Sequence, residues 1–337
     1  MKINRENFLS CLAHAALGVS TKGLIDQSDC LIFRDGDIMS YNGEVRVKVP
    51  GIPGITGAVI PQDLISLVKR IPDDEVDITQ GSDGQLVIEG RNKKAAIVPE
   101  QEIKLDLAEV PDPDEWKKFP GAAVGHLRRA AETCGADEIW GAATCVHIKK
   151  GVIEASDNFR LYRWIGKNGF QDEMFLPAQS IMALSGLTPA SISMKGGWCY
   201  FRDGDVIVSM RGRQIERYPN MEEICKIKGT QVELPGNLGE VAGRAAITAE
   251  GEGHAARISV DIRSGKGRIK STSKRGWYRE SFALTYGGPD LSFDVHPGIM
   301  SEIIKFSPTV TVGKDRILAQ VEGAHLVIAL RMPSTEE

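Results

Sequence analysis

The chain has 337 residues, of which 42% are hydrophobic and 26% charged, and its formal net charge is −4. This length allows two or three domains with cores of their own, and the composition is that of an ordinary soluble globular protein. A protein that holds DNA on a broad adhesive surface is usually basic, so the acidic balance argues against that class.

Six cysteines are scattered along the chain without any C-x-x-C pair: Cys11, Cys30, Cys134, Cys145, Cys199 and Cys225. A chain this large and this poor in cysteine predicts free buried thiols in a reducing compartment. The first ten residues include Lys2, Arg5 and Glu6 and lack an apolar core segment, so they do not resemble a secretory signal. No apolar run approaches the length of a membrane span. We therefore expect a cytoplasmic protein without a membrane partner.

The elements expected in chain order repeat three times. Each period opens with an amphipathic helix, expected over residues 5–17, 122–133 and 237–249. Strands rich in β-branched and aromatic residues follow and are joined by tight turns. The turn glycines are Gly36, Gly151 and Gly267, which lie 115 and 116 residues apart.

Each period then continues with an apolar strand, a proline, a short amphipathic helix and another strand, over residues 59–79, 175–194 and 293–312. The prolines are Pro61, Pro177 and Pro297, which lie 116 and 120 residues apart. Hairpins with glycine turns close each period. Two independent landmarks with one common period indicate a tandem repeat.

The predicted fold class is α+β, with a helix plus three or four antiparallel strands, twice per domain and three times per chain. Residues 108–120 are rich in proline and acidic side chains and predict a linker, and residues 226–236 predict a second one. The expected domains are therefore 1–107, 121–226 and 227–337.

No group of residues has the spacing of an enzyme site. The histidines are scattered without zinc-ligand spacing: His14, His126, His147, His254, His296 and His325. The glycine-rich GKGRIK string (265–270) lies between two expected strands, whereas a phosphate-binding loop must precede a helix. No G-x-S-x-G elbow occurs. We expect a non-catalytic protein without a metal or cofactor.

The segment from Arg263 to Arg279 is rich in lysine and arginine, with Trp277 and Tyr278 among them. Such a cluster can bind nucleic acid, because cations meet phosphates and aromatic rings stack on bases. A pair of strands with alternating exposure would equally present these residues as one solvated face. Both interpretations stay open from the sequence.

Three strings occur in a characteristic order within the repeat. VIEASDNFRLYRW (152–164), RQIERYPNMEEI (213–224) and HLVIALRM (325–332) together resemble the bacterial DNA polymerase III beta subunit, the sliding clamp, and the similarity runs over essentially the whole chain. The family's Thr-Asp-Gly-His-Arg-Leu corresponds to Ser156, Asp157, Asn158, Phe159, Arg160 and Leu161. Pro219 matches the proline of a Gly-Arg-Phe-Pro-Asp-Tyr run. The closing Met-Pro-Met-Arg-Leu becomes Ile328, Ala329, Leu330, Arg331 and Met332.

The resemblance implies a head-to-tail homodimer that closes into a ring around duplex DNA, with helices lining the hole. DNA would be retained topologically, helped by non-specific contacts between cations and phosphates. The candidate DNA-facing residues are Arg5, Lys22, Lys69, Arg70, Arg128, Arg129, Arg244 and Lys305. An apolar pair at the family's ring interface corresponds to Ile247 and Thr248, which predicts a weaker interface here.

The resemblance also implies a pocket for linear motifs of the DNA polymerase and the clamp loader. Its candidate residues are Ser156, Asp157, Asn158, Phe159, Arg160, Leu161, Pro219, Ile224, Leu326, Val327, Ile328, Ala329, Leu330, Arg331 and Met332. The apolar members would form the floor, while Arg160 and Arg331 would orient polar groups of the peptide. An alternative assigns Val327 and Leu330 to ordinary core packing between domains.

The functional hypothesis is a DNA polymerase processivity factor without catalysis of its own. It would raise the output of a polymerase by tethering, which gives a high effective concentration at the primer end. One alternative is a monomeric clamp-like module that regulates replication without encircling DNA. The other is an enzyme on a repeat scaffold, against which the absent catalytic motifs argue.

Overall fold

The structure is a computed structural model that describes residues 1–23, 25–136, 138–251 and 255–330. The chain divides into two compact units. The first unit comprises Met1–Arg128 and Asn168–Gln214, and the second comprises Arg129–Lys167 and Ile215–Glu337. Within the described residues no helix has both the length and the apolarity that crossing a bilayer requires.

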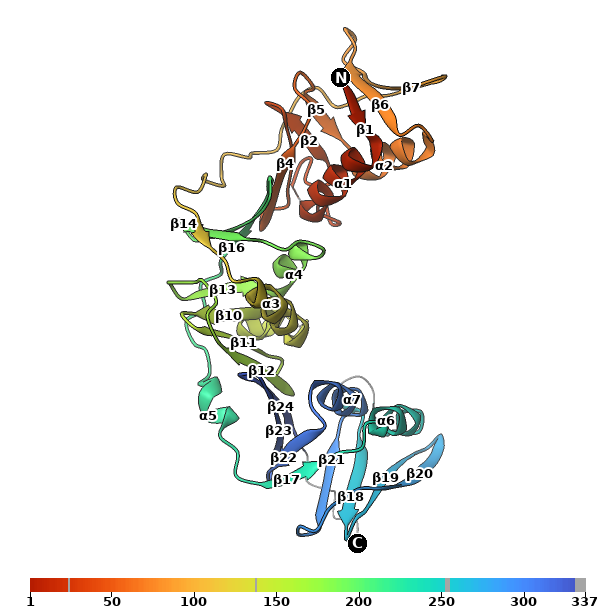
Figure 1. Ribbon diagram of the computed structural model, residues 1–337, viewed down its shortest axis with the longest axis vertical. Coiled ribbons are helices and arrows are strands. Elements are labelled where there is room, and N and C mark those ends of the chain that lie inside the picture. The colour runs from red at the N-terminus through yellow and green to blue at the C-terminus, as the bar shows by residue number, and fades with distance from the viewer. Residues whose placement is uncertain (24, 137, 252–254, 331–337) are drawn as a thin grey trace. The chain divides into compact units, whose positions relative to one another are not determined.

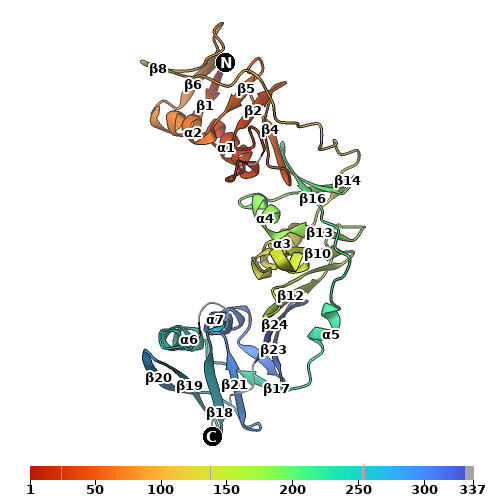
Figure 2. The ribbon, with the colours of Figure 1, turned by 180° about the vertical axis from the view of Figure 1, so that it is seen from behind.

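The order of the elements repeats three times, as a short strand, a helix, four strands, a second helix and three more strands (Figures 1 and 2). The first repeat consists of β1 (Lys2–Asn4), α1 (Arg5–Ala15), β2 (Leu31–Arg34), β3 (Asp37–Tyr41), β4 (Val45–Pro50), β5 (Gly57–Val59), α2 (Pro61–Arg70), β6 (Glu75–Gln80), β7 (Leu86–Gly90) and β8 (Lys93–Ile97). The second consists of β9 (Lys117–Lys118), α3 (Gly121–Thr133), β10 (Cys145–Lys149), β11 (Val152–Ser156), β12 (Arg160–Ile165), β13 (Met174–Pro177), α4 (Ala178–Ile181), β14 (Ser191–Lys195), β15 (Trp198–Asp203) and β16 (Val206–Arg211). After α5 (Met221–Cys225), the third consists of β17 (Thr230–Glu233), α6 (Leu238–Ala246), β18 (Ile258–Arg263), β19 (Lys266–Ser273), β20 (Gly276–Ala283), β21 (Leu291–Val295), α7 (Pro297–Phe306), β22 (Thr309–Val312), β23 (Arg316–Val321) and β24 (Ala324–Ala329).

Local sequence signals account for several helix ends. The Asn4 side chain accepts a hydrogen bond from the Asn7 amide and caps α1. Pro61 and Pro297 occupy the first turns of α2 and α7, where the amide hydrogen that proline lacks has no helical partner anyway. The corresponding helix of the second repeat is shorter than its pattern predicts, because α4 ends at Ile181 and a single 3₁₀ turn follows.

The third turn glycine differs from the one expected. The β18–β19 hairpin turns at Ser264 and Gly265, which both have positive φ, whereas Gly267 lies within β19. An added Cβ on Gly267 would lie 2.0 Å from the Phe282 ring on the neighbouring strand. Gly267 therefore gives space for an aromatic ring, and the turn glycine of the third repeat is Gly265.

The strand pairs β12–β24, β4–β16, β19–β20 and β7–β8 are antiparallel, and this antiparallel pairing confirms the α+β class. In the first unit, the strand orders are β5-β2-β3-β4-β16-β15-β14-β9 and β1-β6-β7-β8. The second unit contains the runs β10-β11-β12-β24-β23-β22-β17 and β20-β19-β18-β21. The β4–β16 and β12–β24 pairs each join one repeat to the next, so a single sheet contains strands of two repeats. The expected boundaries of three domains stay a prediction.

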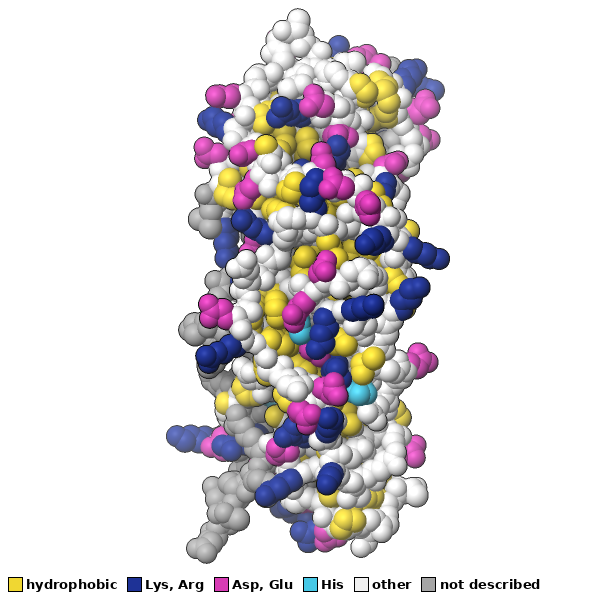
Figure 3. Space-filling model, turned by 90° about the vertical axis from the view of Figure 1, so that its left-hand side faces the viewer, with side chains coloured by type: hydrophobic (Ala, Val, Ile, Leu, Met, Phe, Trp, Pro, Cys, Tyr) yellow, Lys and Arg dark blue, Asp and Glu magenta, His cyan; other side chains and the backbone are white. Residues whose placement is uncertain are grey.

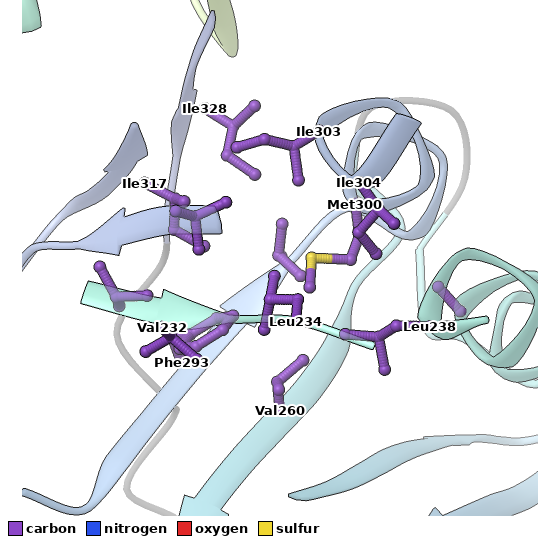
Figure 4. Packing of buried hydrophobic residues seen from close by; sticks show 14 of the residues in the cluster. Val232, Leu234, Leu238, Val260, Phe293, Met300, Ile303, Ile304, Ile317 and Ile328 are labelled. Carbon is purple, nitrogen blue, oxygen red and sulfur yellow. The ribbon is translucent and has the colours of Figure 1, made fainter. Parts of the chain in front are cut away.

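The helices of the third repeat cover the core of the second unit. Leu238 of α6 and Met300 of α7 pack on Val260 of β18 and Phe293 of β21, and all four side chains are at most 3% exposed (Figure 4). Burying such side chains stabilises the fold by roughly 1.5–3 kcal/mol each.

Two connecting segments lie across the sheets at the places where successive repeats join. In the first strap (residues 103–116), Leu105 and Val110 pack with Tyr200 of β15, and the Val110 carbonyl accepts a hydrogen bond from Arg46 at 2.9 Å. The second strap (residues 218–227) packs on β12, β23 and β24. Each strap therefore contacts strands of two repeats.

Candidate functional site

A cavity of about 360 Å³ opens in the second unit beside β12, α5 and β24. Nine of the expected pocket residues line it: Ser156, Asn158, Phe159, Arg160, Leu161, Pro219, Ile224, Val327 and Ala329. Segments more than 100 residues apart in the sequence therefore meet at one cavity, with an apolar floor and a few polar groups at its edge.

The turn between β11 and β12 forms one wall. Asp157 is 8% exposed, and its Oδ1 accepts hydrogen bonds from the Phe159 and Arg160 amides at 2.9 and 2.8 Å. The Ser156 hydroxyl donates to the Arg160 carbonyl at 2.8 Å, and Asn158 has a φ of 72°. Asp157 itself does not line the cavity. It fixes the backbone that presents its neighbours, as aspartate commonly does in turns.

The strand β24 forms the floor with one of its two faces. Val327 and Ala329 line the cavity, whereas Leu326 and Ile328 are fully buried in the core beneath α7. Leu330 also packs in that core. The expectation that all five line the pocket fails for these three, because successive side chains of a strand point to opposite faces. Arg331 and Met332 lie outside the described residues.

Arg160, which lines the cavity, is also held by bonds within its own protein, and its expected role in orienting a bound peptide stays a prediction. Its Nε donates to Asp157 at 2.9 Å and its Nη2 to the Glu132 carbonyl at 2.7 Å, while Nη1 contacts Glu302 of α7. Arg129 also donates to Glu302, at 3.2 Å. The side chain therefore ties the turn to α3 and α7.

Three residues outside the expected set also line the cavity: Met221, Asp315 and Arg316. Arg316 binds both carboxylate oxygens of Asp315 and donates to the Ile224 carbonyl at 3.2 Å, which holds α5 against β23. Met221 lies three residues before Ile224, and helical spacing could have indicated it. Arg316 pairs with Ala329 across β23 and β24, so the expected hairpin could have placed it here.

A buried ionic network lies under the second strap. His147 Nδ1 lies 2.8 Å from one oxygen of Glu154, and Arg163 Nε donates to the other at 2.8 Å. Glu154 is 2% exposed. Burial alone would raise the pKa of this carboxyl, but the hydrogen bonds from His147 and Arg163 outweigh it and lower the pKa. The Tyr218 ring packs over His147 with centroids 4.5 Å apart.

The expected DNA-facing cations fall into two groups. Lys22, Lys69, Arg70 and Lys305 are exposed and form no ion pair with any described residue. The other four are already bound within the protein: Arg5 to the Ile71 carbonyl at 2.8 Å, Arg128 to the Leu187 carbonyl at 2.6 Å, Arg129 to Glu302 at 3.2 Å, and Arg244 to Glu280 at 2.8 Å. Figure 3 presents a different side, the left-hand side of Figure 1, on which cationic and anionic side chains are also interleaved.

The expected interface residues lie directly after α6. Ile247 is 73% exposed, and the Thr248 hydroxyl lies 2.7 Å from that of Ser271 on β19. The basic segment forms the β19–β20 hairpin, on which Lys266, Arg268 and Arg279 are exposed and Lys270 pairs with Asp261 at 2.7 Å. In the described part of the chain, no group of three His, Cys, Asp or Glu side chains could hold a metal.

This architecture is that of the DNA sliding clamps. A putative DNA polymerase III beta subunit from Eubacterium rectale has a TM-score of 0.83 and 15% identity over 98% of both chains. The DNA polymerase III beta subunit of Thermotoga maritima has a TM-score of 0.82 and 16% identity over 99% of both chains. The beta subunit from DNA polymerase of Streptococcus pyogenes has a TM-score of 0.81 and 17% identity over 98% of this chain and 99% of that one. At such identities the likeness shows the fold. No protein-family model and no curated protein matches the sequence.

Proposed function

We propose that the protein is a DNA polymerase processivity factor, a non-catalytic clamp that two copies close into a ring around duplex DNA in the cytoplasm. The fold, shared with DNA polymerase III beta subunits over nearly the full chain, supports this function. The observation that carries the proposal is a pair of strand edges, one in the first repeat and one in the third. Both edges are equivalent to strands that pair with each other inside the chain.

Two strand pairs join successive repeats in the same way. In each, the third strand after the first helix of one repeat (β4 or β12) pairs with the last strand of the next (β16 or β24). The equivalent strands of the terminal repeats are β20 and β8, and each is the edge of its sheet. If β20 of one copy pairs with β8 of a second, the contact is head-to-tail, and its second occurrence closes the ring. Closure also removes edges that would otherwise invite aggregation.

Exposed apolar side chains lie at both edges. Val98 directly follows β8 and is 74% exposed, Trp277 of β20 is 71% exposed, and Ile247 is 73% exposed. These are the three most exposed large hydrophobic side chains among the described residues. Apolar groups that gather where strands lack partners indicate a protein interface.

The cavity beside α5 supports the second part of the proposal, which is docking of linear motifs from a polymerase and a clamp loader. Its volume of about 360 Å³ suits a few apolar side chains of a peptide. Its walls form without a ligand, because Asp157 shapes the turn and Arg316 holds α5. A preformed site lowers the ordering cost of binding.

Replacing Ile224 with aspartate is expected to weaken the binding of a polymerase-derived peptide about 30-fold or more, because a charge would then lie in the apolar wall. Fluorescence polarisation with the dimeric protein measures this loss, and primer extension should lose its stimulation in parallel. The matched control is Glu223→Ala. Glu223 directly precedes Ile224 in α5, and its side chain is 62% exposed. Equal losses in both variants would contradict the pocket assignment.

The exposed pair Lys69 and Arg70 on α2 tests the DNA-facing surface. Alanine at both positions is expected to reduce the slope of log K against log salt for a short duplex by about 0.9 per cation removed. The control Arg217→Ala removes an exposed cation just before the second strap and should leave the slope unchanged. An unchanged slope in the double variant would place DNA on another surface.

Retention on circular DNA tests the whole proposal. The protein, loaded on nicked circular DNA by a clamp loader, should stay bound in high salt and leave after the circle is linearised, because only topology holds it. A monomeric clamp-like module predicts monomers by light scattering at micromolar concentration and release from both DNA forms in high salt. That result would exclude the ring.

A further inference from the structure

We propose that a small cavity beside the pocket accepts a positively charged side chain of the docked segment, with Asp294 as its counterion. The inference rests on the proposed function, since it concerns which linear motifs the pocket accepts. It adds a charge preference to a site whose main volume is apolar.

The small cavity has a volume of about 40 Å³ and lies in the second unit. Phe159 and Ala329 line both this cavity and the larger pocket, so the two are neighbours. A chain docked in the larger pocket can therefore place one side chain in the small cavity. The volume suits the ammonium or guanidinium end of a side chain, and it also suits water.

Asp294 lies on β21 with its side chain opposite to that of Phe293, which packs in the core. It is only 3% exposed, it lines the small cavity, and its Oδ1 has no hydrogen-bond donor in the described chain. Nearly all buried polar atoms in proteins are hydrogen-bonded, because leaving one without a partner costs free energy. A donor from a bound segment would remove that cost.

Among the described residues, neither Arg257 nor His296 of the cavity wall is paired with Asp294 within ion-pair distance. The Arg257 guanidinium lies 3.9 Å from Glu250, and the His296 Nδ1 accepts the Ile299 amide at 3.4 Å. Asp294 forms no ion pair with any residue that the structure describes. A lysine or arginine supplies both the missing donor and the missing charge, whereas a glutamate would be repelled.

The test uses the full-length protein and heptapeptides that carry leucine and phenylalanine side by side. One flanking position at a time is lysine, glutamine or glutamate, and fluorescence polarisation gives each Kd. At one position, lysine should bind about tenfold more tightly than glutamine, and glutamate more weakly. The Asp294→Asn variant should keep the affinity for the glutamine peptide and lose the preference for lysine. The control Asp290→Asn, which changes a 64% exposed side chain, should keep that preference.

The outcomes separate this inference from the proposed function. Binding without a charge preference at any position overturns the inference and leaves the pocket intact, with water as the occupant of the cavity. No binding of any peptide overturns both. Asp294→Asn removes a buried charge without a partner, so its melting temperature should be equal to or above that of the parent. Asp294→Ser provides a second variant if the first does not fold.

Discussion

Replacing Glu154 with alanine is expected to lower the free energy of unfolding of the second unit by about 3–5 kcal/mol, because the buried Arg163 then loses its buried carboxylate partner and keeps only the exposed Glu222. Glu154 bridges His147 and Arg163 at 2.8 Å on each side, and all three side chains are less than 9% exposed. Urea denaturation followed by circular dichroism measures the change. The control Glu222→Ala removes a 58% exposed carboxylate 3.4 Å from the same arginine and should cost less than about 1 kcal/mol.

The same network gives the stability a definite dependence on pH. The folded state lowers the pKa of Glu154, so its contribution is complete above the unfolded pKa of about 4.3 and is lost as the pH falls through the folded value. The Glu154→Gln variant should therefore lose stability less steeply than the parent below pH 5. Parallel acid-denaturation curves for the two proteins would contradict this role.

Changing Ile247 to aspartate and Trp277 to alanine together is expected to convert the proposed dimer into a monomer, with a dimer Kd raised about 100-fold or more. Both side chains are more than 70% exposed in the single chain and lie on or near the β20 edge. Sedimentation or light scattering over a concentration series measures the change. Val321→Asp alters a 39% exposed apolar residue away from both edges and should leave the dimer intact.

The internal strand pairs also predict the register of the contact between copies. Lys48 pairs with Ile207 and Arg163 with His325, and these partners are the second residues of β16 and β24. The second residue of β8 is Lys94. The Ser40 hydroxyl of β3 donates to the carbonyl of Ala15, the last residue of α1, at 2.5 Å. The Ser271 hydroxyl of β19 donates in the same way to the carbonyl of Ala245 near the end of α6, at 2.7 Å, which aligns β3 with β19.

By this alignment, Arg279 takes the place of Lys48 and lies opposite Lys94 of a second copy. Like charges on directly paired residues destabilise a sheet. Glu89 of β7 also pairs with Lys94, at 3.4 Å, but both side chains are exposed, and exposed ion pairs are weak. The Lys94→Glu variant should therefore dimerise about three- to tenfold more tightly at low salt, and added salt should strengthen the parent dimer. A weaker Lys94→Glu dimer would require a different register.

The repeat could be predicted from the sequence because its landmarks are backbone-determined. Proline at a helix start and glycine at a turn are local requirements, so Pro61 and Gly36 indicate their elements without knowledge of the tertiary structure. The prediction that Gly267 is a turn glycine was wrong for a related reason. In sequence, a glycine that makes space for an aromatic ring within a strand looks the same as a glycine in a turn. The sequence segments that form the walls of the pocket could be predicted from the three strings. The strings do not indicate which side chains of those segments face the pocket.

A shift of one residue on β24 separates Val327, which lines the cavity, from Ile328, which is in the core. Both are β-branched and apolar, so composition does not distinguish them, and only the pairing of β24 with β12 fixes the face. It was harder still to predict which lysine and arginine side chains are free to contact DNA. Arg70 and Arg128 look alike on their helices, yet Arg128 is bound to two carbonyls. Such pairing depends on loops that the helical pattern does not describe.

The two straps decide where a ring of this protein would open. At both joints inside one chain, the polypeptide itself crosses the seam, so strand separation there would also have to peel off the strap and its apolar contacts. The proposed joint between copies would be held by the strand edges and a few exposed apolar side chains, with no strap across it. A loader that opens the ring for DNA entry would therefore separate β20 of one copy from β8 of the other. The β4–β16 and β12–β24 joints within each chain would stay paired and act as hinges.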